Sequence, residues 1–182
     1  MKTQNILLLV SFITVLIFSS FIDNDENDLK DKFVVVLDAG HGGKDPGNLG
    51  NGYREKDIAL KTVLAVGREL DKNPNIKVVY TRKTDVFIDL FVRGKIANNE
   101  KADLFVSIHL NNIDGSAANK AKYEGAEIYM AAKEKAVNYD ANYTLANYLA
   151  ATLQEVGTPF NGVKTREKGI WVLQAVQCPS AL

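Results

Sequence analysis

Two runs of apolar residues stand out in the hydrophobic pattern of the chain. The first is Phe33–Ala39, interrupted only by Asp38, and the second is Leu104–Ile108, which contains Ser107. Continuous apolar runs of this length are typical of parallel strands that are covered on both faces of a sheet. We therefore predict two buried strands at these positions.

Helical and strand-like patterns alternate along the rest of the chain. Apolar residues recur at helical spacing within residues 60–70 and 145–156, and strand-like runs occupy residues 77–82 and 125–130. A further helix is predicted from Ile88, Phe91, Val92 and Ile96, and Ile170–Leu173 is predicted to be a strand or a buried segment. This alternation predicts one α/β domain, residues 33–182, with a largely parallel sheet.

The chain begins with an apolar segment that does not belong to this domain. Residues 1–22 are mostly apolar and carry Lys2 near the start, which is typical of a secretory signal or an N-terminal anchor. A cleaved signal is the interpretation we favour, and residues 23–32 form a polar linker. In either case we expect an exported domain, located in the periplasm or the cell envelope.

Composition narrows the possible partners and sites. The chain has 22 basic and 22 acidic residues, so its net field does not favour binding to nucleic acid. Its one cysteine, Cys178, excludes an intrachain disulfide framework and a cysteine-rich zinc site.

The two histidines of the chain each follow one of the buried strands. His41 comes just after the first apolar run and His109 directly after the second. The carboxyl ends of parallel strands meet at one edge of a sheet, where ligands commonly bind. Two imidazoles and one carboxylate are a usual ligand set of hydrolytic zinc sites. The pattern therefore indicates a metal site whose third ligand is an acid near this edge.

Several acids compete for that third position. A loop rich in Gly, Asn and Pro follows His41 and delivers Glu55 to the start of a predicted helix. Acids are also favoured in a first helical turn by the helix dipole, so spacing alone does not separate Glu55 from Asp45 or Asp57. Asp38 is expected either to hold the loop or to orient His41 by a hydrogen bond.

The segments around these positions match a known pattern in order and spacing from Val34 to the last residue. They are Leu37–Gly47, Arg54–Asp57, Ala102–Asn111, Gly125–Tyr129 and Trp171–Leu173. Together they resemble the zinc-dependent N-acetylmuramoyl-L-alanine amidases of the amidase type 3 family. The combination is far more specific than any one of its motifs.

The resemblance implies a zinc ion held by His41, Glu55 and His109. It also implies hydrolysis of the amide between N-acetylmuramic acid and L-alanine of the peptidoglycan stem peptide, with Asn111 and residues 110–126 bordering the substrate groove. The implied fold is a three-layer α/β/α sandwich with a mostly parallel sheet of about six strands. Three further matching residues are interpreted as scaffold that ties helix to sheet: Arg82, Asp85 and Arg93.

The resemblance also places a second, catalytic glutamate a few residues beyond Leu182. General acid–base assistance of the kind expected from that glutamate is worth about 10²–10⁴-fold in rate. We therefore expect the 182-residue chain to carry the metal ligands but no catalytic base, and to lack the last elements of the fold. Its hydrolysis of peptidoglycan should be slow.

Two further expectations concern regulation and alternatives. Some amidases of this family carry a long insert that forms an autoinhibitory helix, but here only Ala131 to Asn142 separate a strand from the next helical stretch, so no such helix is expected. Control by export, localisation or an accessory activator protein is expected instead.

The alternative function is a non-catalytic peptidoglycan-binding or interaction module. A zinc carboxypeptidase is a weaker option, which the context Ser107–Asn111 disfavours.

Overall fold

The computed structural model describes residues 32–50, 52–111, 124–166 and 168–182. The predicted signal or anchor and nearly all of the polar linker lie outside these ranges. Within them, no helix has the length and apolar content needed to cross a membrane.

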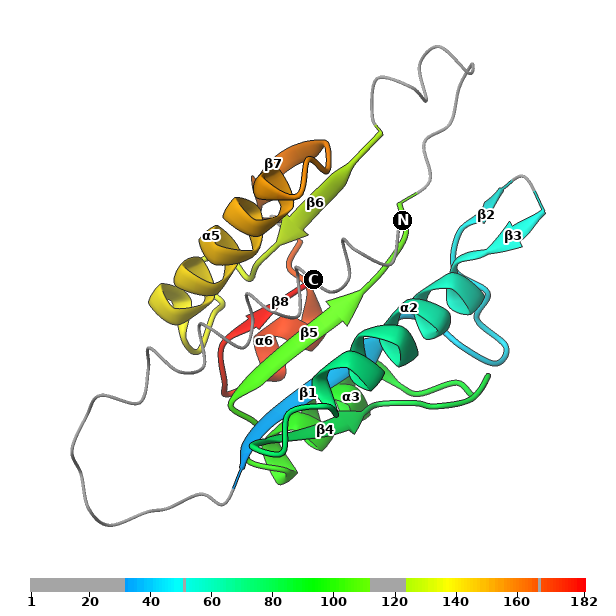
Figure 1. The fold of residues 1–182 in the computed structure, drawn as a ribbon, viewed down its shortest axis with the longest axis horizontal. Helices are drawn as coiled ribbons and strands as arrows, with labels where there is room; N and C mark the ends of the chain where they lie inside the picture. Colours follow the sequence, from blue (N-terminus) through cyan, green and yellow to red (C-terminus); the bar gives the residue numbers. More distant parts are fainter. Residues whose placement is uncertain (1–31, 51, 112–123, 167) are drawn as a thin grey trace.

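A four-stranded parallel sheet forms the centre of the domain (Figure 1). β1 lies between two neighbours, and its residue Leu37 is in register with Tyr80 on one side and Val106 on the other. Both apolar runs are therefore buried parallel strands, as predicted. In spatial order the strands are β4 (Ile76–Tyr80), β1 (Phe33–Ala39), β5 (Leu104–Ile108) and β8 (Ser180–Ala181).

A second parallel pair, β6 (Ala126–Tyr129) and β7 (Phe160–Lys164), extends this sheet. The Tyr129 N–H donates to the carbonyl of Leu182 at 2.7 Å, and the Leu182 N–H donates back at 2.9 Å. Such a reciprocal pair is the antiparallel pattern, so β6 runs against β8. The expected sheet of mostly parallel strands is thus present. β7 was not predicted, because its sequence has no clear apolar alternation.

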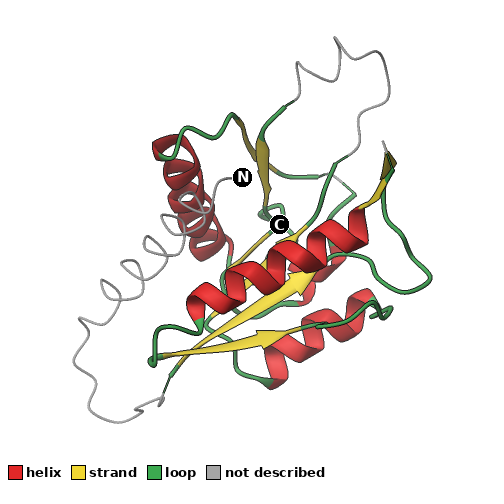
Figure 2. Cartoon of the chain, turned by 45° about the vertical axis from the view of Figure 1, so that its right-hand side comes forward, coloured by secondary structure: helices red, strands yellow, loops and turns green. Residues whose placement is uncertain are grey.

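Helices cover both faces of the sheet (Figure 2). Side chains alternate across β1, so Val35 and Leu37 pack with α2, whereas Val36 packs with Phe105 and the buried residues of the opposite layer. This arrangement confirms the three-layer α/β/α fold. The helices are α2 (Glu55–Leu70) and α5 (Tyr139–Glu155) on one face, and α3 (Leu90–Asn99) and α6 (Trp171–Ala175) on the other.

The helix α3 exists where it was predicted, but it leaves exposed two of the four apolar residues that predicted it. Phe91 is 69% exposed and Val92 is 42% exposed, whereas Arg93 is buried. Gly94 faces α6 closely, because a Cβ at this position would lie 2.9 Å from the Cβ of Ala175. A buried arginine and a glycine contact therefore set the orientation of α3, and neither is visible to an apolar pattern.

The segment Ile170–Leu173 forms most of the short helix α6 and not a strand. The Ile170 carbonyl accepts hydrogen bonds from the N–H groups of Leu173 and Gln174. Val172 and Leu173 are buried, but Trp171 is 72% exposed. The buried-segment alternative was right for part of this run, and the strand was wrong because packing against α3 overrides the β propensity of these residue types.

Candidate metal centre

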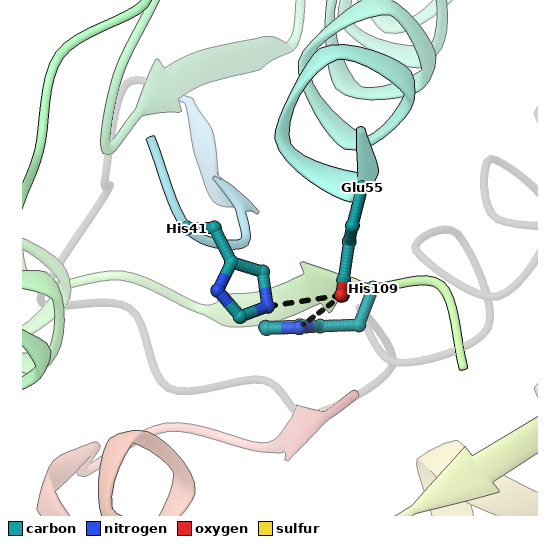
Figure 3. Close-up of side chains that lie close together, drawn as sticks. All are labelled: His41, Glu55 and His109. Atoms are coloured by element: carbon teal, nitrogen blue, oxygen red, sulfur yellow. Dashed lines mark hydrogen bonds and ion pairs between the residues drawn. The ribbon is translucent and has the colours of Figure 1, made fainter. Parts of the chain in front are cut away.

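His41, Glu55 and His109 meet at the carboxyl edge of the central sheet (Figure 3). His41 follows β1, His109 follows β5, and Glu55 is the first residue of α2. Glu55 Oε1 lies 3.1 Å from His41 Nε2 and 2.9 Å from His109 Nδ1. The two imidazole rings are 4.9 Å apart and nearly perpendicular. One possible ligand atom from each residue lies within 4.8 Å of the others.

This group has donor types and a spacing that could hold a metal ion such as zinc. Ligand atoms about 2.1 Å from a tetrahedral zinc lie about 3.4 Å from one another, and the distances to Glu55 Oε1 are only a little shorter. The Glu55 side chain is 1% exposed, whereas those of His41 and His109 are 24% and 25% exposed. The group is therefore anchored on its protein side and accessible from solvent on the other.

Hydrogen bonds fix Glu55 in its charged form. Burial alone would raise the pKa of Glu55. Hydrogen bonds from His109 and from the backbone N–H groups of Asn48 and Leu110 outweigh this effect, and the pKa falls to about 2. The carboxylate is thus ionised at neutral pH. The Asn48 side chain donates to Glu55 Oε2 at 2.8 Å and to the Leu110 carbonyl at 2.7 Å. The sequence pattern does not single out Asn48, because asparagine in a turn-forming loop usually stabilises the turn itself.

The two other candidate ligands lie outside the group of three. Asp45 Oδ2 is 2.8 Å from His41 Nδ1, which leaves Nε2 of this ring facing Glu55. Burial raises the pKa of Asp45, but its hydrogen bonds with His41 and Gly47 lower it overall. Asp57 is on the surface, 2.6 Å from Arg54. Asp45 is therefore placed to orient His41, and Asp57 has no contact with the site.

Asp38 holds the loop and does not touch the His41 ring. Its carboxylate accepts hydrogen bonds from Thr81, Ser107 and Arg93 at 2.6–2.7 Å. Arg93 in turn donates to the backbone carbonyls of Ala39 and His41, each at 2.6 Å. The first of the two expected roles of Asp38 is confirmed, and the second belongs to Asp45.

The other scaffold residues support the same loop. Arg82 donates to the carbonyls of Ala39, Gly40 and Lys56 at 2.7–2.9 Å. Asp85 accepts from the Gly43 N–H at 2.8 Å and from Lys56 Nζ at 2.6 Å. The scaffold interpretation of Arg82, Asp85 and Arg93 is therefore confirmed.

Two glycines leave room for the histidine and glutamate side chains. A Cβ at Gly40 would lie 2.4 Å from the His109 ring. Gly47 has a φ of +66°, and a Cβ there would lie 2.6 Å from the His41 ring and 2.7 Å from Glu55 Oε2. Only glycine permits both this backbone conformation and these approaches.

Asn111 borders the group but is not part of it. Its side chain is exposed and donates to Glu127 Oε2 at 2.9 Å. Most of the predicted groove segment 110–126 lies outside the described residues. A separate cavity of about 360 Å³ lies at the amino ends of β5 and β8, where Asn98, Asp103 and Cys178 are among its lining residues. It does not touch the metal ligands, so it is not the candidate site.

Comparisons with known proteins give several matches to this chain. Residues 35–182 match the sequence profile of the family described as N-acetylmuramoyl-L-alanine amidase. N-acetylmuramoyl-L-alanine amidase LytC of Bacillus subtilis is 34% identical over 166 residues, which cover 86% of this chain and 30% of LytC. An endolysin of Bacillus phage SPP1 is 51% identical over 82 residues, which cover 45% of this chain and 30% of the endolysin.

A solved structure shows the same fold. The crystal structure of N-acetylmuramoyl-L-alanine amidase from Clostridium difficile 630 matches with a TM-score of 0.73 and 30% identity, over 84% of this chain and 78% of that one. The chain spans less than a third of the length of the two curated relatives described above.

Proposed function

The chain belongs to the N-acetylmuramoyl-L-alanine amidase family, and we propose that it hydrolyses the amide bond between N-acetylmuramic acid and L-alanine of the peptidoglycan stem peptide. We propose that a zinc ion held by His41, Glu55 and His109 takes part. The observation that carries this proposal is the convergence of these three side chains at one accessible edge of the sheet.

Each part of the site has a role in this reaction. A zinc ion so held would polarise a carbonyl and lower the pKa of a bound water. Asp45 orients the His41 ring, and Asn48 with the Leu110 N–H fixes the Glu55 carboxylate. The exposed sides of the two histidines leave room for a polymeric substrate. The glutamate that would protonate the leaving amine stays a prediction from the resemblance, and we assign this step to no described residue.

We further propose that the protein works outside the cytoplasm, in the periplasm or cell envelope. The apolar segment at residues 1–22 supports this location, because it has the features of a signal or anchor. Control by an accessory activator or by export remains our proposal. Residues 130–138, which join β6 to α5, form a loop without a helix.

Purified peptidoglycan incubated with the zinc-loaded chain tests this proposal. Mass spectrometry should detect intact stem peptides and peptide-free glycan, which arise only from cleavage at the lactyl–alanine bond, and a chelator should abolish them. Cleavage elsewhere, or cleavage that survives the chelator, would contradict the proposal. Binding to peptidoglycan without any cleavage, even after long incubation, would favour the non-catalytic module.

Asp45→Asn should weaken zinc binding without removing it. The substitution removes the charge that Nδ1 of His41 faces at 2.8 Å, and loss of such an outer partner typically lowers metal affinity by about 10–100-fold. Competition with a chromophoric chelator measures the effect. Unchanged affinity would show that Asp45 does not orient His41.

A further inference from the structure

The strand pair β6–β7 has one apolar face and one polar face. Ile128 and Val163 pack with α5. Because side chains alternate along a strand, Glu127 and Tyr129 lie on the opposite face, and Lys164 joins them there as the register partner of Tyr129. The contacts agree, since Glu127 accepts hydrogen bonds from both the Tyr129 hydroxyl and Lys164.

This polar face is continuous with the metal centre. Asn111, which donates to Glu127, lies two residues beyond His109, a span of at most about 7 Å in an extended chain. The Leu110 N–H between them donates to Glu55. The segment 109–111 therefore connects the metal ligands to the polar face through direct hydrogen bonds.

Among its described residues Glu127, Lys164 and Arg166, the polar face carries one positive charge in excess. Lys164 is balanced by Glu127, and the hydrogen bond from Lys164 holds the pKa of Glu127 below its usual value. Arg166 lies 4.6 Å from the centroid of the Tyr129 ring, and none of the described carboxylates lies within ion-pair distance of it. A guanidinium held on an aromatic face keeps its donors free for a carboxylate.

We propose that Arg166, supported by Tyr129 and the Glu127–Lys164 ion pair, forms a subsite for a carboxylate of the stem peptide. The inference rests on the proposed function, because it needs the scissile amide to lie at the metal centre. The second and third stem residues then lie one and two residues beyond the alanine, and each extended residue adds about 3.5 Å. This reach takes the peptide along Asn111 onto the polar face.

The test measures binding to the metal-free chain, so that no hydrolysis occurs. Isothermal titration compares muramoyl peptides that carry either a free carboxylate or a carboxamide on the second residue, and a second pair that differs in the same way on the third residue. We expect about tenfold tighter binding of the free carboxylate in one pair, the size of a charge-assisted hydrogen bond. The pair of ligands that shows this difference tells which stem-peptide residue carries the carboxylate bound by Arg166.

The variant Arg166→Gln should remove this discrimination, and Arg166→Lys should keep part of it. Arg68→Gln is the matched control, because Arg68 is an exposed arginine thirteen residues after Glu55 on α2, about 20 Å along the helix. Equal binding of carboxylate and carboxamide in both pairs, or discrimination that survives Arg166→Gln, would overturn the subsite while the proposed function stood. Failure of every ligand to bind would also overturn the subsite, whereas the proposed function is tested separately by the cleavage products of peptidoglycan.

Discussion

Glu55→Gln is expected to lower the zinc affinity of the chain by more than about a hundredfold, the upper range for loss of an outer partner alone. The amide keeps the shape of the side chain but removes its charge. It also brings N–H donors toward the backbone N–H groups of Asn48 and Leu110, which now donate to the carboxylate at 2.8 and 2.9 Å. Competition with a chromophoric chelator measures the affinity, and any chelator-sensitive release of stem peptides should fall with it.

Asp57→Asn is the matched control for this experiment. It makes the same change of acid to amide two residues farther along α2, where Asp57 is exposed and paired with Arg54. Its zinc affinity should equal that of the unmodified chain. Equal losses in the two variants would show that net charge, and not ligation by Glu55, determines the affinity.

Arg93→Met should reduce the free energy of unfolding by about 3–5 kcal/mol, which is typical when one partner of a buried ion pair is removed. Arg93 and Asp38 are 2% and 1% exposed and lie 2.7 Å apart. The substitution would leave Asp38 charged in the core and would release the carbonyls of Ala39 and His41. Urea denaturation followed by circular dichroism, with zinc absent, measures the change.

A surface ion pair provides the comparison. Lys77→Met removes a partner of Glu100 from a pair that is 51% and 38% exposed, so it should change stability by less than about 1 kcal/mol. If Arg93→Met does not fold, Arg93→Lys can be measured instead, because it keeps the charge but not the forked contacts of the guanidinium. Its loss of stability should be larger than that of Lys77→Met and smaller than the loss expected for Arg93→Met. A loss no larger than that of Lys77→Met would contradict a structural role for Arg93.

The fold was predictable where burial alone determines the pattern. β1 and β5 are apolar because both faces of the sheet are covered. Since the two strands are parallel, the residues that follow them, His41 and His109, lie at the same edge of the sheet. The pattern placed α3 but not the face that this helix buries, because its anchor is a charged arginine. Arg93 pairs with Asp38, and its other contacts are backbone carbonyls. Such contacts depend on atoms that every residue has, so they leave no periodic signal.

The candidate metal centre was predictable only in part for a related reason. Strand ends indicated the two histidines, but the choice among Glu55, Asp45 and Asp57 depends on how the loop folds back between β1 and α2. In the structure Glu55 turns inward because Asn48 and Leu110 offer donors to it, and Asp45 reaches the far side of the His41 ring. The polar face with Arg166 was missed, since β7 itself was not predicted.

The distances along the chain between the three ligands have a consequence for when the ion enters. His41 follows a central strand, and Glu55 and His109 are 54 residues apart in sequence, so the ligands come together only after β1, α2 and β5 have packed. A chain threaded through a membrane in an unfolded state would therefore travel without its ion. Metal selection in proteins depends partly on which ions are available where the site forms. The compartment in which this chain folds, and not the one in which it is synthesised, would then decide which metal it carries.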